Sequence, residues 1–568
     1  MKIPRGYKRL QAFLETTIGE CGVSRQSRMN EAKFYRDYLL RGSPDGSKQV
    51  VFNKCGPYID FVSSTLFSPI EARFLIDYEY TDDEASLDMA VKAARILTRD
   101  LQKTNTDEKF SQGVYWASTY GCMFLRDNWG HHGAEPNLVF PCQMGVLKEN
   151  TNDLDRQEAF TLRHYITKGQ FMRMIMGHPD EAELKKNVLR TAASARKGED
   201  FQDNMMNQLI LSGINNAVSV TGTNQKQGSF LFGNAIPSFG AEVLAEMIEL
   251  NETWVRDLET AGDDEGDYGD WVTFLSVGEH IIEGRYKQRN LSDVYGETGF
   301  TQIVPFPVEG YFWGRSKLAD VNNLQDEFVG RLNAYNRIAK MRANPARLAT
   351  GMSGLTEPKF SAQNKPGGLL SDANPNAKMQ SLAPDMPTEQ EYMMGQVDTF
   401  FDEAGGLTEG MKGQGAAGVR SDDHFSGMIR TGSTRIRNKA INVERQYSEV
   451  GDFRLKLLQV KKPGTQIHKT KKGVEFRLID LPPDWRVTVD SHSSSPMFSD
   501  DNRQLALQLA KLKIIDGVTA IRMIHPPMED EVVDSIERKE KQEQEMLEKA
   551  AKQDPSIWAK IFGGGKKK

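Results

Sequence analysis

Acidic side chains gather in one short run of the sequence, and clustered carboxylates of this kind are the oxygen ligands that Ca²⁺ takes. Residues 262–267 read Gly-Asp-Asp-Glu-Gly-Asp. An EF-hand loop needs Asp at its first position, Gly at its sixth and a bidentate Glu at its twelfth, and no register of this run supplies all three. We therefore expect a solvated hairpin turn between strands at residues 253–256 and 271–275.

Imidazole and thiolate groups are the other candidates for metal-ligand chemistry. His131 and His132 are adjacent, so their side chains diverge on a helix or a strand, and the other histidines form no H-E-x-x-H array. The widely spaced cysteines, none of them in a C-x-x-C pair, are Cys21, Cys55, Cys122 and Cys142. These patterns predict a surface histidine pair, reduced and partly buried thiols, and no metal or other cofactor.

Neither a nucleotide-binding motif nor a nucleophile motif is complete in the sequence. Gly413, Gly415 and Gly418 match G-x-G-x-x-G, but no strand pattern precedes them and no G-K-[ST] follows. A mobile glycine loop is therefore favoured over a phosphate site. Ser426 lacks the first glycine of a G-x-S-x-G elbow. The chain is predicted not to be an enzyme; the alternative is an enzyme whose site is assembled from distant segments.

Composition narrows the class of protein. The 568 residues allow roughly four domain-sized units, or fewer if one is elongated. Hydrophobic residues at 39% and charged residues at 26% are ordinary for a folded soluble protein. The net charge of -6 argues against a general DNA-coating protein, which needs a basic surface. The basic N-terminus lacks an apolar h-region, and no later run is apolar enough, so we expect neither a signal peptide nor a membrane span.

Helical periodicity dominates the first 200 residues. The residues that mark three helices are Phe34, Tyr35, Tyr38 and Leu39 in the first, Ile59, Val62 and Leu66 in the second, and Leu87, Ala90, Ala94 and Leu97 in the third, which spans residues 85–104. The strand-like segments are residues 122–126, 137–140, 253–256 and 271–275. The predicted fold class is therefore α+β, predominantly α.

Two long amphipathic helices flank a segment rich in Pro and Gly. The first, within residues 314–343, carries a stripe of apolar residues at spacings of three and four: Leu318, Val321, Leu324, Phe328, Leu332, Tyr335 and Ile338. Ser316 can cap its start and Pro345 stops it, which leaves about 28 residues in a rod of roughly 40 Å. Residues 344–386 are expected to form a loop-rich tip.

The second helix is expected at residues 387–404. Thr388 and Glu391 have capping-box spacing, and Gly405 with Gly406 can end the helix. Its apolar face is Met393, Val397, Phe400, Phe401 and Ala404. The residues expected to make helix contacts across the two rods are Leu324, Phe328, Leu332, Val397 and Phe400. A glycine loop at residues 405–420 and a helix from residue 421 to about 460 follow.

This order of elements resembles the portal proteins of tailed bacteriophages. The resemblance is carried by Gly-Tyr-Phe-Trp-Gly-Arg-Ser at residues 310–316, by Leu-Gln-Asp-Glu at 324–327 and Leu332-Asn333 on the first rod, by the glycine loop, by Ser421 and by Val-Thr-Val at 487–489. It covers most of the chain, although residues 200–250 have no counterpart. It implies an elongated subunit of wing, stem, clip and crown that assembles into a ring.

The resemblance divides the chain as follows: wing 1–313, first stem helix 314–343, clip 344–386, second stem helix 387–404, tunnel loop 405–420, long wing helix and returning strands 421–499, and helical crown with a basic tail 500–568. Lys412, Gln414 and Arg420, in or beside the tunnel loop, are expected to face the channel and to touch DNA phosphates transiently. The C-terminal Gly-Gly-Gly-Lys-Lys-Lys, residues 563–568, is expected to attract packaged DNA near the inner mouth of the channel.

The function that the resemblance implies is passage of double-stranded DNA through a ring, usually of twelve subunits, at one capsid vertex. Twelve helices of about 10 Å leave a lumen of roughly 28 Å. The implied partners are the terminase large subunit, the tail adaptor, and the major capsid and scaffolding proteins, in the virion and in the host cytoplasm during assembly, without a membrane. A portal needs no nucleotide site, in agreement with the missing Walker motif. Another virion structural or adaptor protein, or an unrecognised enzyme, is the alternative.

Overall fold

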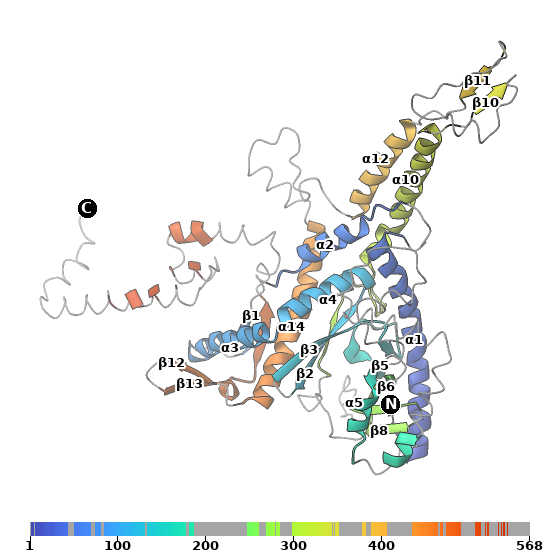
Figure 1. The fold of residues 1–568 in the computed structure, drawn as a ribbon. Helices are drawn as coiled ribbons and strands as arrows, with labels where there is room; N and C mark the ends of the chain where they lie inside the picture. The colour runs from blue at the N-terminus through green and yellow to red at the C-terminus, as the bar shows by residue number, and fades with distance from the viewer. Residues whose placement is uncertain are drawn as a thin grey trace, which may run out of the picture.

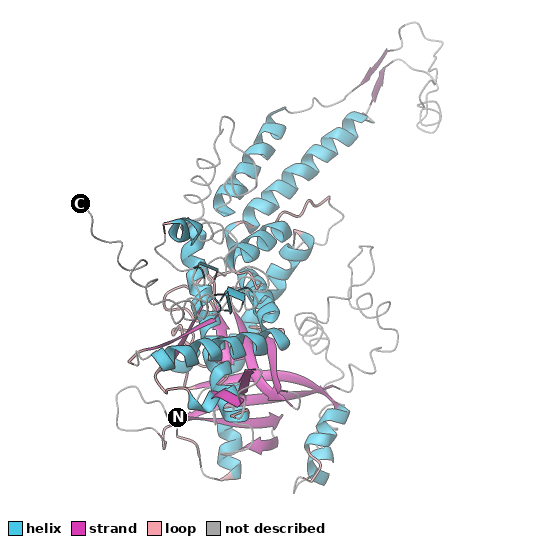
Figure 2. Ribbon diagram, turned by 90° about the vertical axis from the view of Figure 1, so that its left-hand side faces the viewer, coloured by secondary structure: helices cyan, strands magenta, loops and turns pink. Residues whose placement is uncertain are grey.

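The structure is a computed structural model. It describes residues 2–4, 6–43, 50–69, 74–80, 84–130, 133–177, 181–186, 247–260, 269–278, 280–284, 298–343, 345, 347–350, 376, 378–381, 388–405, 434–463, 466–469, 473–489 and 506–512, with scattered positions between 517 and 542. These residues form a mixture of helices and antiparallel sheets, so the predicted α+β class is confirmed (Figure 1, Figure 2). None of the described helices is long and apolar enough to cross a membrane.

Five helices build the main core. They are α1 (Tyr7–Arg41), α2 (Cys55–Leu66), α3 (Glu84–Lys103), α4 (Thr106–Tyr120) and α14 (Thr434–Lys461). The rings of Phe67, Phe74 and Phe110 each lie within 4.9 Å of the Tyr447 ring, centroid to centroid. α14 therefore packs against aromatic side chains from the N-terminal part of the chain. The three helices predicted in the N-terminal part are present, because their apolar spacing supplies one buried face each.

Two predicted core positions are wrong. Phe34 and Leu87 are both exposed. On α3 the buried residues instead include Ser86, Ala90 and Leu97. Ser86 lies one helical turn before Ala90 and therefore on the same face. Phe34 stacks edge-on against its neighbours on α1 and keeps its outer side in water.

A five-stranded antiparallel sheet in the order β4-β5-β6-β7-β8 lies beside α1 (Figure 1). Its strands are β4 (Met144–Val146), β5 (Ala159–Thr167), β6 (Met247–Asp257), β7 (Asp270–Val277) and β8 (His280–Gly284). α1 packs so closely that a Cβ at Gly145 would lie 2.2 Å from the carbonyl oxygen of Cys21. The pairing of Asp257 with Asp270 agrees with the predicted hairpin, whose turn at 262–267 lies outside the described residues.

Smaller sheets and short helices complete the body. β3 (Gly133–Val139), β2 (Met123–Gly130) and β9 (Phe300–Ile303) form a three-stranded sheet in that order, and β1 (Phe74–Tyr78) pairs with β14 (Trp485–Val489). β12 (Gln466–Lys469) pairs with β13 (Gly473–Arg477). The short helices are η1 (Leu154–Arg156), α5 (Lys168–Met174) and η5 (Leu478–Asp480). Strands were expected to follow the long helix, and one of them, β14, pairs with β1 of the N-terminal part of the chain.

An antiparallel pair of helices, α10 (Asn322–Ala343) and α12 (Thr388–Gly405), projects from this body, and β10 (Arg347–Thr350) pairs with β11 (Lys378–Ser381) at its far end (Figure 1, Figure 2). The predicted single rod begins as a separate 3₁₀ turn, η4 (Lys317–Asp320), because the Ser316 side chain caps it by accepting from the Leu318 N–H. α10 is thus about 33 Å long. The tip, expected to be rich in loops, also contains this two-stranded ribbon.

Several predicted segments lie outside the described residues. They are residues 200–246, the pair His131-His132, the glycine loop after Gly405, most of the segment from residue 490 onward, and the C-terminal residues 563–568.

Candidate functional site

The projecting hairpin is fastened to the body by a row of residues on one face of α10. Gln325, Val329 and Asn333 are spaced by four, and the first two are buried. Gln325 Nε2 donates to the carbonyl of Phe52 at 2.8 Å, and the Lys54 N–H donates to Gln325 Oε1 at 3.3 Å. The Gln325 side chain therefore binds the segment that precedes α2 through one donor and one acceptor, much as the backbone of a neighbouring strand would.

Asn333 completes this grip one helical step further along. It accepts from the Val50 N–H and donates to the Val50 carbonyl, both at 2.9 Å. A β-like pair of hydrogen bonds is thus made by a single side chain on a helix. The root of the hairpin is held in register on residues 50–54 by these contacts.

Lys54 joins the two helices of the hairpin. Its Nζ forms an ion pair with Asp398 on α12. The same atom lies 4.3 Å from the centroid of the Phe328 ring on α10 and 5.9 Å from that of Phe401 on α12. A partly desolvated ammonium over aromatic faces is attracted by the ring quadrupoles. Lys54 therefore bridges α10 and α12 at one level near the root.

Two tyrosines hold the ends of the root. Tyr58 on α2 donates its hydroxyl to the carbonyl of Gly405 at 3.0 Å. A Cβ at Gly405 would lie 2.8 Å from the Tyr58 ring, so only glycine fits there. Tyr38 on α1 donates to Asp326 Oδ2 on α10 at 2.5 Å. Burial, and then this carboxylate, raise the pKa of Tyr38, so its hydroxyl stays a neutral donor.

The segment that leads from β9 into the hairpin is packed into the body. Phe312 and Trp313, within the Gly-Tyr-Phe-Trp-Gly-Arg-Ser run, are buried. Trp313 Nε1 donates to Glu149 Oε1 at 2.8 Å, and Ser24 donates to the same oxygen at 2.5 Å. Ser316 donates to the carbonyl of Thr119 at 2.5 Å. These contacts fix the point at which the hairpin leaves the body.

The predicted contact residues divide into two groups. Val397 is buried, and Leu324, Phe328 and Leu332 are half-buried. Phe400 keeps 51% of its surface exposed, so among the described residues it is not buried between the two helices. The expected single apolar face of α12 is also wrong in this respect, because consecutive helical residues lie about 100° apart and the structure turns Phe401, not Phe400, inward.

Large apolar side chains remain in water along the outer flanks of the hairpin. Besides Phe400, the exposed fractions are 67% for Tyr392 and 38% for Met393 on α12, and 45% for Met341 on α10. Single exposed apolar residues need no explanation, but four on one projecting element favour a contact surface.

The two helices of the hairpin also carry opposite charge. α12 has no Lys or Arg, and its acidic residues are Glu389, Glu391, Asp398, Asp402 and Glu403. The acidic residues of α10 are Asp326 and Glu327, near its start, and its basic residues are Arg331, Arg337, Lys340 and Arg342. The hairpin therefore has one mainly basic helix, α10, and one acidic helix, α12.

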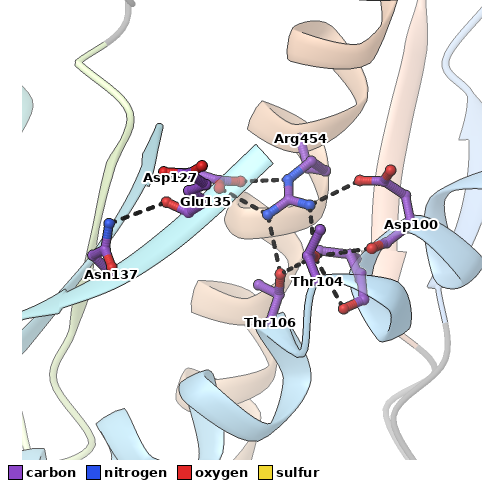
Figure 3. A network of polar contacts seen from close by, with 8 residues as sticks. Asp100, Thr104, Thr106, Asp127, Glu135, Asn137 and Arg454 are labelled. Carbon is purple, nitrogen blue, oxygen red and sulfur yellow. Dashed lines mark hydrogen bonds and ion pairs between the residues drawn. The ribbon is translucent and has the colours of Figure 1, made fainter. Parts of the chain in front are cut away.

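A buried polar network links the long helix that follows the hairpin to the body (Figure 3). The Arg454 side chain on α14 is fully buried. It donates to both carboxylate oxygens of Asp127 on β2, at 2.5 and 2.7 Å, and to Asp100 on α3 at 2.8 Å. It also donates to the hydroxyls of Thr104 and Thr106, each at 3.0 Å. Burial alone lowers the pKa of Arg454, but the carboxylates of Asp127 and Asp100 raise it above its ordinary value.

A second buried carboxylate, Glu252 on β6, is surrounded by an Arg, a His and a Trp, residue types that also occur together in catalytic sites. It accepts from Arg126 at 2.6 and 2.9 Å, from Trp254 Nε1 at 2.9 Å, and lies 3.1 Å from His164 Nε2. Burial raises the pKa of Glu252, but Arg126 and His164 outweigh it and hold that pKa well below its usual range. Both carboxylate oxygens are occupied, so the cluster ties β2 to the five-stranded sheet.

The four cysteines are all free and buried, more completely than expected. Burial raises the pKa of Cys21, Cys55 and Cys142 to about 12, so these thiols stay protonated and poorly nucleophilic. Among the residues that the structure describes, no group of three or more His, Cys, Asp or Glu could hold a metal ion.

The sequence-predicted channel residues Lys412, Gln414 and Arg420 lie outside the described residues. Sequence reasoning found the two helices and named Gln325 and Asn333 among the residues that carry the family resemblance, but it assigned no contact to either and missed Lys54. A further signal for the two amides was their spacing with Val329 on one helical face. Comparison of the sequence with protein-family models gives no match, and a search of curated proteins gives none either.

Proposed function

We propose that this chain is the subunit of a portal, a ring-shaped channel at one vertex of a tailed-bacteriophage capsid through which double-stranded DNA is packaged and ejected. In this proposal α10 and α12 are the stem, β10 and β11 belong to the clip, and α14 is the long wing helix. The clip docks the terminase motor during packaging and the tail adaptor afterwards.

The observation that carries the proposal is the hairpin itself. It is fastened at its root through Lys54, Gln325 and Tyr58, while its outer flanks keep Phe400 and Met393 in water. A helix pair that exposes apolar residues and opposite charges on its flanks is stabilised when neighbouring copies cover them. Repetition of one such contact around an axis closes a ring.

The order of elements along the chain supports the same proposal. A mixed body leads into the outgoing helix, a tip, the returning helix and then the long helix α14, which packs in the body and is bonded there through Arg454. This is the order that the resemblance to portal proteins implies. The net charge of -6 per subunit also suits a conduit, because a mostly repulsive bore lets DNA slide.

Imaging and mass measurement of the purified full-length protein test the proposal. Negative-stain electron microscopy is expected to reveal rings with a central hole, and native mass spectrometry is expected to give an oligomer, usually of twelve copies. A protein that stays a compact monomer under all salt and concentration conditions would overturn the proposal. A closed ring that cannot support DNA packaging would favour a virion adaptor instead.

A further inference from the structure

Lys54 defines which way each helix of the hairpin faces. Phe328 on α10 and Asp398 on α12 both contact its ammonium, so these two residues lie at one level of the hairpin. Gly330 and Phe400 each follow two residues later. Two residues turn an α-helix by about 200°, so both face away from Lys54, and both are exposed.

These two outward positions are complementary in shape. Nothing lies within 4 Å of a Cβ built at Gly330, so the surface of α10 is open and carries no side chain at this position. Phe400 is a large side chain exposed by 51% on α12. The helices are antiparallel, which separates the two residues by about 6 Å along the hairpin, roughly one turn. Helical side chains lean toward the helix N-terminus, so Phe400 leans toward the tip and closes part of this gap.

The complementarity continues along both flanks. Met393 and Glu389 lie within about 20° of Phe400 around α12, because they precede it by 7 and 11 residues. On α10, Ala334 and Arg337 lie within about 40° of Gly330 by the same reckoning. At about 1.5 Å per residue from the Lys54 level, Met393 comes opposite Ala334 and Glu389 opposite Arg337. One flank is therefore large and acidic where the other is small and basic.

We propose that Phe400 of one copy packs on the bare helix surface at Gly330 of a second copy, with Met393 on Ala334 and Glu389 paired with Arg337. The two patches differ and lie on different helices, so the contact is head-to-tail and every copy uses both patches. This inference rests on the proposed ring and names the residues that hold neighbouring subunits together. Its occupant is a second copy of this chain.

A matched pair of glycine variants tests the contact. Gly330 and Gly395 are both exposed in mid-helix, and a Cβ at either would meet nothing within 4 Å. Gly395 lies about 140° around α12 from Phe400, off the proposed contact. Leucine favours helix over glycine, so Gly330→Leu and Gly395→Leu should both fold. We expect Gly330→Leu to weaken self-association at least about tenfold, as loss of a central aromatic contact does, and Gly395→Leu to leave it unchanged.

Disulfide trapping gives an independent readout. The native cysteines are buried, so cysteines introduced as Gly330→Cys and Phe400→Cys react alone. Mixing the two single variants should give covalent dimers on oxidation, and the double variant a ladder up to the full ring. Gly330→Cys mixed with Gly395→Cys is the control and should give none.

The charge pair provides a third measurement. Glu389→Arg alone should weaken association, and adding Arg337→Glu should restore it. If wild-type rings form while the two leucine variants associate equally and no ladder appears, the contact is wrong and the ring stands. If the wild-type protein never leaves the monomer, the ring fails and the contact fails with it.

Discussion

Arg454 and Asp127 share two hydrogen bonds across 327 positions of the chain, and both side chains are buried (Figure 3). The pair fixes the C-terminal half of α14 against β2. A buried ion pair of this kind is costly to break from one side, because the remaining charge loses its partner without gaining water.

Arg454→Met is therefore expected to lower the free energy of unfolding by about 3–5 kcal/mol, since it strands Asp127 and Asp100. Arg454→Lys keeps the charge but cannot make the forked pair, and should recover only part of the loss. Urea titration followed by tryptophan fluorescence measures both. The control is Arg156→Met, which removes an exposed partner of Asp153 and should cost less than about 1 kcal/mol. An equal loss in the two Met variants would contradict the assigned role of Arg454.

The root of the hairpin gives a second prediction. Gln325→Leu preserves volume but leaves the Phe52 carbonyl and the Lys54 N–H without their partner, which should cost about 1–3 kcal/mol. The loss is local, so amide hydrogen exchange should quicken in α10 and α12 while α4 and the five-stranded sheet keep their protection. Asn323→Leu, at an exposed position of the same helix, is the matched control. If amide exchange in α10 and α12 of the Gln325 variant were as slow as in the wild type, Gln325 would have no role in fastening the hairpin.

Much of this architecture could be predicted from sequence, because the signals were local. Apolar residues at spacings of three and four marked α2 and α3, and a glycine marked the end of α12 at Gly405. Alternation of apolar residues marked β6 and β7. Such signals locate elements but not their neighbours in space.

The contacts that define the candidate site could not be predicted, because they join distant parts of the chain. Gln325 and Asn333 interrupt the apolar stripe of α10 and read as solvent-facing, yet they hold residues 50–54. Nothing near Lys54 indicates a partner more than 270 positions away. Phe400 and Phe401 are equally apolar in sequence, and only the packing of Tyr58 against Phe401 decides which one turns inward.

The pKa of Glu449 predicts how the stability of the fold changes with pH. Burial, and then the nearby carboxylates of Asp155, Asp153 and Asp452, raise the pKa of Glu449 from 4.5 to about 7. A raised pKa in the folded state favours the protonated fold, so this contribution to stability is complete below about pH 4.5 and is lost as pH rises through 7.

Glu449→Gln mimics the protonated side chain and should remove this dependence. The carboxyl group lies among three others, but Glu449 as a residue is exposed, so solvent screens these neighbours. The variant is therefore expected to gain less than about 1 kcal/mol over the wild type at pH 8 and almost nothing at pH 4.5. Thermal unfolding at both pH values measures the difference. Glu309→Gln, at an exposed carboxylate, should follow the wild-type curve. A Glu449 variant whose advantage does not grow between pH 5 and 8 would contradict the raised pKa.

The last prediction concerns the cations of the glycine loop, which the proposed function places at the DNA. In the proposed ring, Lys412 and Arg420 would neutralise phosphates only while DNA is inside, so the double variant Lys412→Gln with Arg420→Gln should still assemble. Fewer counterions are released when fewer phosphates are neutralised, so the slope of log affinity for duplex DNA against log salt should become shallower. The matched control, Lys148→Gln with Arg156→Gln, removes two exposed cations of the body that are paired with Glu158 and Asp153 and should leave the slope unchanged. Equal slopes in both double variants would assign the loop cations to solvent and not to DNA.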